Sequence, residues 1–119
     1  MKEERADLRV RTKEFALRNI TLFTSLPKSA VAQTLGRQLL RSSTSVGANF
    51  REAYRARSDA EFVAKVGDCL KELEETSYWL EILSDSGTVP HAKLVSLVDE
   101  ASQLTAILTT IAKKVRSRA

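Results

Sequence analysis

Four arginines, Arg37, Arg41, Arg51 and Arg55, stand at spacings that bring them together if this part of the chain is helical. On a straight α-helix that turns about 100° per residue, the four lie within about 80° of one another. Guanidinium groups bind phosphate oxygens in bidentate geometry, so such a stripe can contact the backbone of a nucleic acid. A second basic cluster near the C-terminus would add affinity that does not depend on sequence; it contains Lys113, Lys114, Arg116 and Arg118.

These eight cations have other interpretations. They could form a solvated face, or pair with the acidic surface of a neighbouring subunit or of another protein. The four phenylalanines all fall on apolar helical stripes, which leaves no aromatic platform for stacking unpaired bases. If the chain binds nucleic acid, we therefore expect contacts to the phosphate backbone and strong sensitivity to salt.

Few residues have the chemistry that catalysis requires. His91 is the single histidine and stands beside Pro90, away from any carboxylate that could orient it as a general base. Cys69 lies on an apolar stripe, where a buried and inert thiol is expected. A cluster of glutamates at 72–81 points in several directions around its helix, which favours a solvated or salt-bridged face. We therefore expect no catalytic residue, no metal site and no cofactor.

A polar strip borders the apolar face of the predicted second helix. Ser45, Asn49 and Glu52 belong to it, and it could form a pore or a partner contact. A buried hydrogen-bond network is the favoured interpretation, in which Asn49 and Glu52 satisfy groups on the next helix such as Lys71 or Thr76. Asn19, in the apolar stripe of the first helix, would belong to a network of the same kind.

Length and composition restrict the fold that positions these residues. The chain has 119 residues, of which 43% are hydrophobic and 29% charged, as expected for one globular domain over residues 1–119. With Gly 4 and Pro 2, frequent turns and an all-β fold are improbable. One cysteine forms no internal disulfide, and neither a secretory leader nor an apolar run of membrane-spanning length is present, so we expect a cytoplasmic protein.

Apolar residues recur every three or four positions in four segments. They predict an all-α, up-down antiparallel four-helix bundle with helices at about 7–26, 30–56, 59–85 and 90–116. Residues 1–6 would fray and 117–119 would form a basic tail. The run SSTS at 42–45, followed by Gly47, would either kink the second helix or be held helical by packing, and we favour packing. Wide apolar faces beyond the seams indicate a homo-oligomer.

Several segments carry a family resemblance. The run LRSSTSVGANFREA at 40–53 resembles the central signature of four-helix-bundle proteins encoded in intervening sequences of bacterial large-subunit ribosomal RNA genes. The pairs Phe15-Ala16 and Leu26-Pro27, and segments within 71–80, resemble the same family, so the resemblance covers about residues 14–84. At Asn19 this family tends to have an aliphatic residue.

The resemblance also suggests partners. The family is similar to the accessory protein of diversity-generating retroelements, a basic bundle that assembles as a homopentamer and binds nucleic acid and a reverse transcriptase. This implies a pentameric, non-enzymatic accessory or scaffold protein that binds structured RNA or DNA. The alternative is a protein–protein interaction module whose basic face meets an acidic partner, with no nucleic-acid role.

Overall fold

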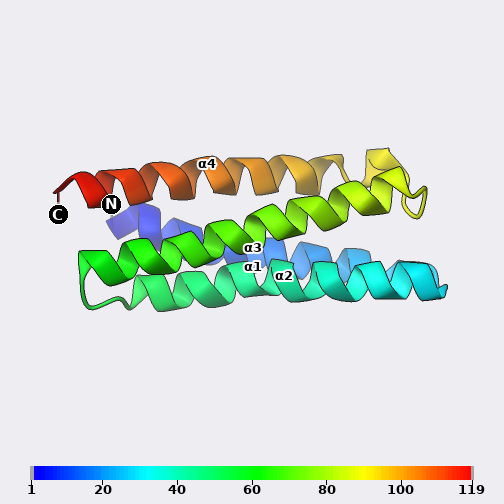
Figure 1. Cartoon of the computed structure of the whole chain (residues 1–119), viewed down its shortest axis with the longest axis horizontal. Coiled ribbons are helices and arrows are strands. Elements are labelled where there is room, and N and C mark those ends of the chain that lie inside the picture. The colour runs from blue at the N-terminus through cyan, green and yellow to red at the C-terminus, as the bar shows by residue number, and fades with distance from the viewer. Residues whose placement is uncertain (1, 119) are drawn as a thin grey trace.

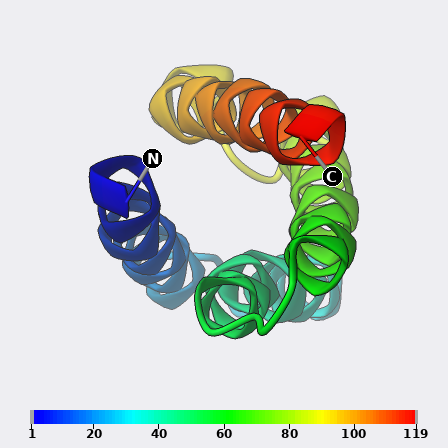
Figure 2. The ribbon, with the colours of Figure 1, turned by 90° about the vertical axis from the view of Figure 1, so that its left-hand side faces the viewer.

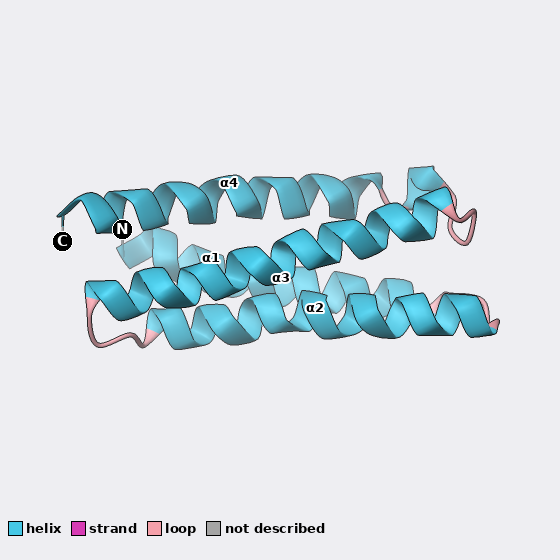
Figure 3. Ribbon diagram, in the orientation of Figure 1, coloured by secondary structure: helices cyan, strands magenta, loops and turns pink. Residues whose placement is uncertain are grey.

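The computed structural model describes residues 2–118, which form four long helices. These are α1 (Lys2–Thr24), α2 (Ala30–Tyr54), α3 (Asp59–Asp85) and α4 (Val95–Arg118), with one turn of 3-10 helix, η1 (His91–Lys93), before α4. Successive helices run antiparallel, and the molecule measures 48 × 20 × 19 Å (Figure 1). No strand occurs within residues 2–118 (Figure 3). The predicted all-α four-helix bundle is confirmed.

The four helices surround one core in the order of the chain. Viewed along the bundle, α2 lies between α1 and α3, and α4 lies opposite α2 (Figure 2). Aromatic and aliphatic side chains from all four helices fill the centre with almost no exposed surface, among them Phe15, Phe50, Phe62, Leu39, Leu73 and Leu104. These side chains occupy the apolar stripes expected from the sequence, because each stripe must face the core to leave water.

Short polar motifs fix where the helices begin and end. The Ser29 hydroxyl accepts a hydrogen bond from the Ala32 amide at 3.2 Å, and Ser58 accepts one from the Glu61 amide at 3.1 Å. Both serines are therefore N-caps. The Glu61 carboxylate accepts from the Arg57 amide at 3.4 Å rather than from the Ser58 amide, so the return bond of a capping box is shifted by one residue here.

Three predicted boundaries are wrong. Residues 2–6 are helical rather than frayed, because Arg5 stacks on the Phe62 ring with 3.9 Å between guanidinium carbon and ring centroid. Residues 117 and 118 are also helical, with Arg118 paired to Asp59 at 3.4 Å. The fourth helix begins at Val95 instead of about residue 90, since η1 turns the chain so that Leu94 is buried. Met1 and Ala119, the remaining residues of the predicted frayed end and basic tail, lie outside the described residues.

Helix α2 continues without interruption through the run at 42–47. The hydroxyls of Thr44 and Ser45 donate to carbonyl oxygens four residues earlier, at 2.8 and 2.7 Å. At Gly47, an added Cβ would lie 3.4 Å from the Thr12 carbonyl oxygen of α1. The backbones of α1 and α2 therefore pass close to each other at this point, and the expectation that packing holds the run helical agrees with the uninterrupted helix. At Gly36 the space is filled by the side chains of Phe23 and Leu26 instead of by backbone.

Candidate nucleic-acid interface

Charge is distributed unevenly along the bundle axis. The half that contains both chain ends and the α2–α3 turn comprises residues 2–13, 43–71 and 107–118, and we call it the terminal half (Figure 1). It carries fourteen Lys and Arg against seven Asp and Glu, a net charge of +7. The other half carries five against eight, a net charge of −3. The positive potential is therefore concentrated at one end of the molecule.

All eight predicted basic residues are exposed, but two of them already have acidic partners. Arg41 pairs with Glu75 and, at 3.5 Å, with Glu72. The hydrogen bond to Glu75 raises the pKa of Arg41, and the same bond lowers the pKa of Glu75. Arg118 is held by Asp59 at 3.4 Å. Within residues 2–118 the other six form no ion pair; these are Arg37, Arg51, Arg55, Lys113, Lys114 and Arg116.

The structure also divides the predicted arginine stripe on α2. Arg41 leans toward the carboxylates of α3, whereas Arg51 leans toward α1. On the α1 side Arg51 lines an open hollow of about 270 Å³ together with Arg9 and Lys13. Arg41 and Arg51 therefore border different helices, although their spacing placed them on one stripe.

Arg9 and Lys13 were missed by the sequence analysis. A signal for them exists, because Lys2, Arg5, Arg9 and Lys13 are separated by three, four and four residues and so share one side of α1. Arg9 lies with its guanidinium carbon 5.2 Å from the centroid of the Tyr54 ring, which fixes it beside α2.

The predicted polar network has different partners from those expected. Thr76 is buried, and its hydroxyl lies 2.9 Å from that of Ser42. Glu52 pairs with Lys65 at 2.9 Å instead of with Lys71, which is exposed. The Ser45 hydroxyl bonds within its own helix, to the carbonyl of Arg41, and Asn49 is half-buried. Glu52 is directed outward on α2, so it reaches the exposed edge of α3 instead of its buried face.

Asn19 is fully buried in α1, and only one of its polar atoms is satisfied within residues 2–118. Its Nδ2 donates to the Phe15 carbonyl at 2.9 Å, while its Oδ1 has no hydrogen-bond partner there. The predicted network around Asn19 is therefore limited to its own helix.

The single thiol and the single imidazole occupy the environments expected for them. Cys69 is buried beneath α2, and desolvation raises the pKa of its thiol to about 12. A thiol in this state is a poor nucleophile at neutral pH. His91 is exposed, with Nδ1 3.5 Å from the Ser84 hydroxyl. Within residues 2–118, no three His, Cys, Asp or Glu side chains converge as metal ligands would.

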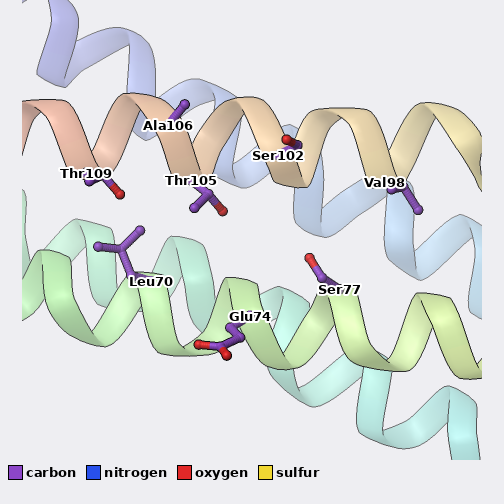
Figure 4. Close-up of a pocket in the computed structure, with 8 residues that line it drawn as sticks. All are labelled: Leu70, Glu74, Ser77, Val98, Ser102, Thr105, Ala106 and Thr109. Carbon is purple, nitrogen blue, oxygen red and sulfur yellow. The ribbon is translucent and has the colours of Figure 1, made fainter.

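A second surface feature lies between α3 and α4. It is an open groove of about 660 Å³, in which Leu70, Glu74 and Ser77 of α3 face a row of small side chains on α4 (Figure 4). None of the helices described in residues 2–118 has an apolar stretch that would carry it across a bilayer.

The comparisons with known proteins agree on the family. The sequence profile of the 23S rRNA-intervening sequence protein family matches residues 5–110. The chain belongs to this family. A crystal structure from Bacteroides thetaiotaomicron, described as a protein of unknown function from the S23 ribosomal protein family, superposes with a TM-score of 0.86 at 34% identity. That match covers 92% of this chain and 98% of the other. No curated protein matches the chain.

Membership confirms the resemblance seen in the sequence, and the solved relative confirms the helical-bundle fold over nearly the whole chain. Neither comparison assigns a catalytic activity, because the solved relative is itself described as having an unknown function.

Proposed function

We propose that this 23S rRNA-intervening sequence protein is a non-enzymatic accessory factor that binds structured RNA or DNA through the cations of its terminal half. The observation that supports this most strongly is the net charge of +7 on that half, where five exposed predicted cations have no ion-pair partner within residues 2–118. These are Arg51, Arg55, Lys113, Lys114 and Arg116. Such a surface attracts phosphate over the Debye length of about 8 Å at physiological salt.

The recognition we propose is of the phosphate backbone rather than of bases. Phe15, Phe50 and Phe62 are fully buried, Tyr54 is half-buried beside Arg9, and the exposed Tyr78 lies in the other half, so these rings offer a base no free platform beside the terminal cations. Contacts to phosphate displace condensed counterions, which makes the affinity fall linearly with the logarithm of the salt concentration. A cytoplasmic location, where nucleic acid is abundant, is part of the same proposal.

A salt titration with a structured RNA tests the function. Fluorescence anisotropy of a labelled hairpin should show binding at low salt. The logarithm of the association constant should fall with the logarithm of the salt concentration with a slope of about −3 if three to four phosphates are contacted. An absence of binding at low salt would refute the proposal. Tighter binding to an acidic peptide of the same net charge would instead favour the protein–protein interaction module.

We also propose that the chain forms a homo-oligomer, with five subunits as the family resemblance implies. Val10 and Leu17 are 55% and 52% exposed on the outer face of α1, and Tyr78 and Val98 are 53% and 41% exposed over α3 and α4. Because these two apolar patches differ, each would meet the other kind on a neighbouring subunit. Head-to-tail contacts of this type form a ring when the rotation between subunits divides a full turn, and a pentamer requires a rotation of about 72°. Light scattering should give about five times the 13.2 kDa of one chain, whereas a monomer at micromolar concentration would refute the assembly.

A further inference from the structure

A basic groove runs along the seam between α1 and α2 in the terminal half. Two adjoining hollows of about 270 and 530 Å³ both have Arg9, Lys13 and Arg51 in their walls. We call these hollows together the α1–α2 groove. In the end view of the bundle, α1 and α2 are neighbours along this seam (Figure 2).

The floor of the groove is low because the residues beneath the cations are small. Gly47 and Ala48 line it from α2, and Ala16 lines it from α1. At Gly47 a Cβ would stand in ordinary contact with the α1 backbone, 3.4 Å from the Thr12 carbonyl oxygen, so the two helices lie close together along this seam. Arg9 and Lys13 of α1 border this floor on one side, and Arg51 of α2 borders it on the other.

The cations of the groove are not neutralised by the protein. Arg9, Lys13 and Arg51 form no ion pair within residues 2–118. On the opposite flank of α1, by contrast, Arg11 is held by Glu100 through hydrogen bonds of 3.1 and 2.7 Å. An arginine bound in this way must give up its carboxylate partner before it can bind a ligand, whereas the cations of the groove have no carboxylate partner to give up within residues 2–118.

We propose that the α1–α2 groove holds the sugar–phosphate backbone of one nucleic-acid strand, with Arg9 and Lys13 contacting it from one side and Arg51 from the other. This assignment rests on the proposed function and specifies where it occurs. The net charge of +7 on the terminal half complements a polyanion, and the guanidinium groups of Arg9 and Arg51 bind phosphate oxygens in bidentate geometry. A phosphate backbone is therefore the occupant that the charge of the groove favours. The strand is assigned to the narrower hollow, because the wider one is lined by Glu14, which opposes a phosphate, and by Val10 and Leu17 of the proposed subunit contact.

A matched pair of charge reversals on α2 tests the groove. Arg51→Glu changes a cation of the groove. Arg37→Glu is its control: Arg37 is also exposed, lies about 21 Å away along the same helix, and likewise forms no ion pair within residues 2–118. With a labelled RNA hairpin at fixed low salt, we expect Arg51→Glu to weaken binding about tenfold and Arg37→Glu less than about twofold. The slope of log affinity against log salt should become smaller in magnitude by about one in Arg51→Glu and should not change in Arg37→Glu. Circular dichroism checks that both remain folded.

A gain of affinity provides the second test. Glu14→Gln removes the carboxylate at the rim and should strengthen binding about twofold, because a like charge near the phosphates is lost. Equal losses in Arg51→Glu and Arg37→Glu would overturn the groove while the proposed function remains. A wild-type protein that does not bind RNA would overturn the proposed function itself. Displacement of the RNA from the groove by poly-glutamate at equal charge concentration would overturn the assignment to a nucleic-acid strand.

Discussion

The two flanks of α2 handle charge in opposite ways. On the flank toward α3, Arg41 is paired with two glutamates, and Glu52 is paired with Lys65. On the flank toward α1, Arg51 stands beside two further cations and has no carboxylate partner within residues 2–118. Both flanks contain the same residue type on the same helix. The neighbouring helix, rather than the arginine itself, therefore determines whether a cation is neutralised by a carboxylate or is available to bind a ligand.

The flanks also differ in how closely the helices approach. On the α1 flank, the side chains of Phe23 and Leu26 occupy the space where a Cβ of Gly36 would stand, while a Cβ at Gly47 would only touch the α1 backbone. The α3 flank instead uses a buried hydroxyl pair, Ser42 and Thr76. The first flank should be intolerant of added volume at Gly36, and the second should be sensitive to the loss of a hydrogen bond.

Glycine-to-alanine variants give the largest expected difference between regions. At Gly36 a Cβ would lie 2.5 Å from Leu26 Cδ1 and 2.8 Å from Phe23 Cδ1, whereas at Gly67 nothing lies within 4 Å. Both changes gain helix propensity, but only the first adds volume to a filled site. We expect Gly36→Ala to lower the free energy of unfolding by about 1 kcal/mol and Gly67→Ala to raise it by about 1 kcal/mol, as measured by urea denaturation. Equal effects would show that the α1 seam is not tightly packed.

Asn19→Leu should stabilise the α1 flank. The change keeps the number and branching of the side-chain heavy atoms, gives up the bond from Nδ2 to the Phe15 carbonyl, and removes a buried Oδ1 that has no partner within residues 2–118. We expect a gain of about 1.5 kcal/mol in the free energy of unfolding, seen as a higher midpoint of thermal unfolding. Asn19→Asp is the matched control: it buries a charge at the same position and should lower the free energy of unfolding. A loss of stability in Asn19→Leu would mean that the amide makes a favourable contact.

Thr76→Val tests the α3 flank. Valine keeps the shape of the side chain but leaves the buried Ser42 hydroxyl without its partner at 2.9 Å, so we expect a loss of about 1 kcal/mol. Thr105→Val is the control, because Thr105 is exposed and bonds only the Ala101 carbonyl of its own helix. Its effect should be below about 0.5 kcal/mol in the same urea measurement. Similar losses in both variants would contradict a specific role for the buried hydroxyl pair.

Arg41→Gln should have the smallest effect on stability, because the ion pair is largely exposed and screened. Arg41 lowers the pKa of Glu75 below its ordinary value of 4.5. A carboxyl group whose pKa is lower in the folded protein than in the unfolded chain stabilises the fold at pH values above its ordinary pKa. This stabilisation is lost as the pH falls through the lowered pKa of the folded state. The variant should therefore be less stable than the wild type by under about 0.5 kcal/mol at pH 7, and the difference should shrink toward pH 3. A difference that grows as the pH falls would contradict this linkage.

The sequence predicted the fold closely because its physical determinants are local. The apolar stripe of Phe62, Val66 and Cys69, the caps at Ser29 and Ser58, and Gly87 with φ +75° all depend on neighbours within one or two helical turns. The ends of α1 and α4 were predicted wrongly because contacts between distant residues hold them. Arg5 on Phe62 and Arg118 on Asp59 have no counterpart in local sequence pattern.

The candidate interface was predicted less completely, and for the same reason. The spacing of Arg41 and Arg51 places both on the outer side of α2, but it contains no information about which neighbour each one leans toward. Glu75 lies 34 positions after Arg41 in the chain, and Lys13 lies 38 positions before Arg51. Only the packing of α1 and α3 on either side of α2 separates the neutralised arginine from the available one.

The most direct test of this account compares Arg51→Gln with Arg41→Gln in one RNA-binding assay at fixed low salt. Each variant removes one exposed arginine charge from the same helix; the two sites differ in the neighbouring helix and lie about 15 Å apart along α2. The account predicts that Arg51→Gln weakens binding by about five- to tenfold, while Arg41→Gln changes it less than about twofold. Equal losses, or a larger loss for Arg41→Gln, would contradict it.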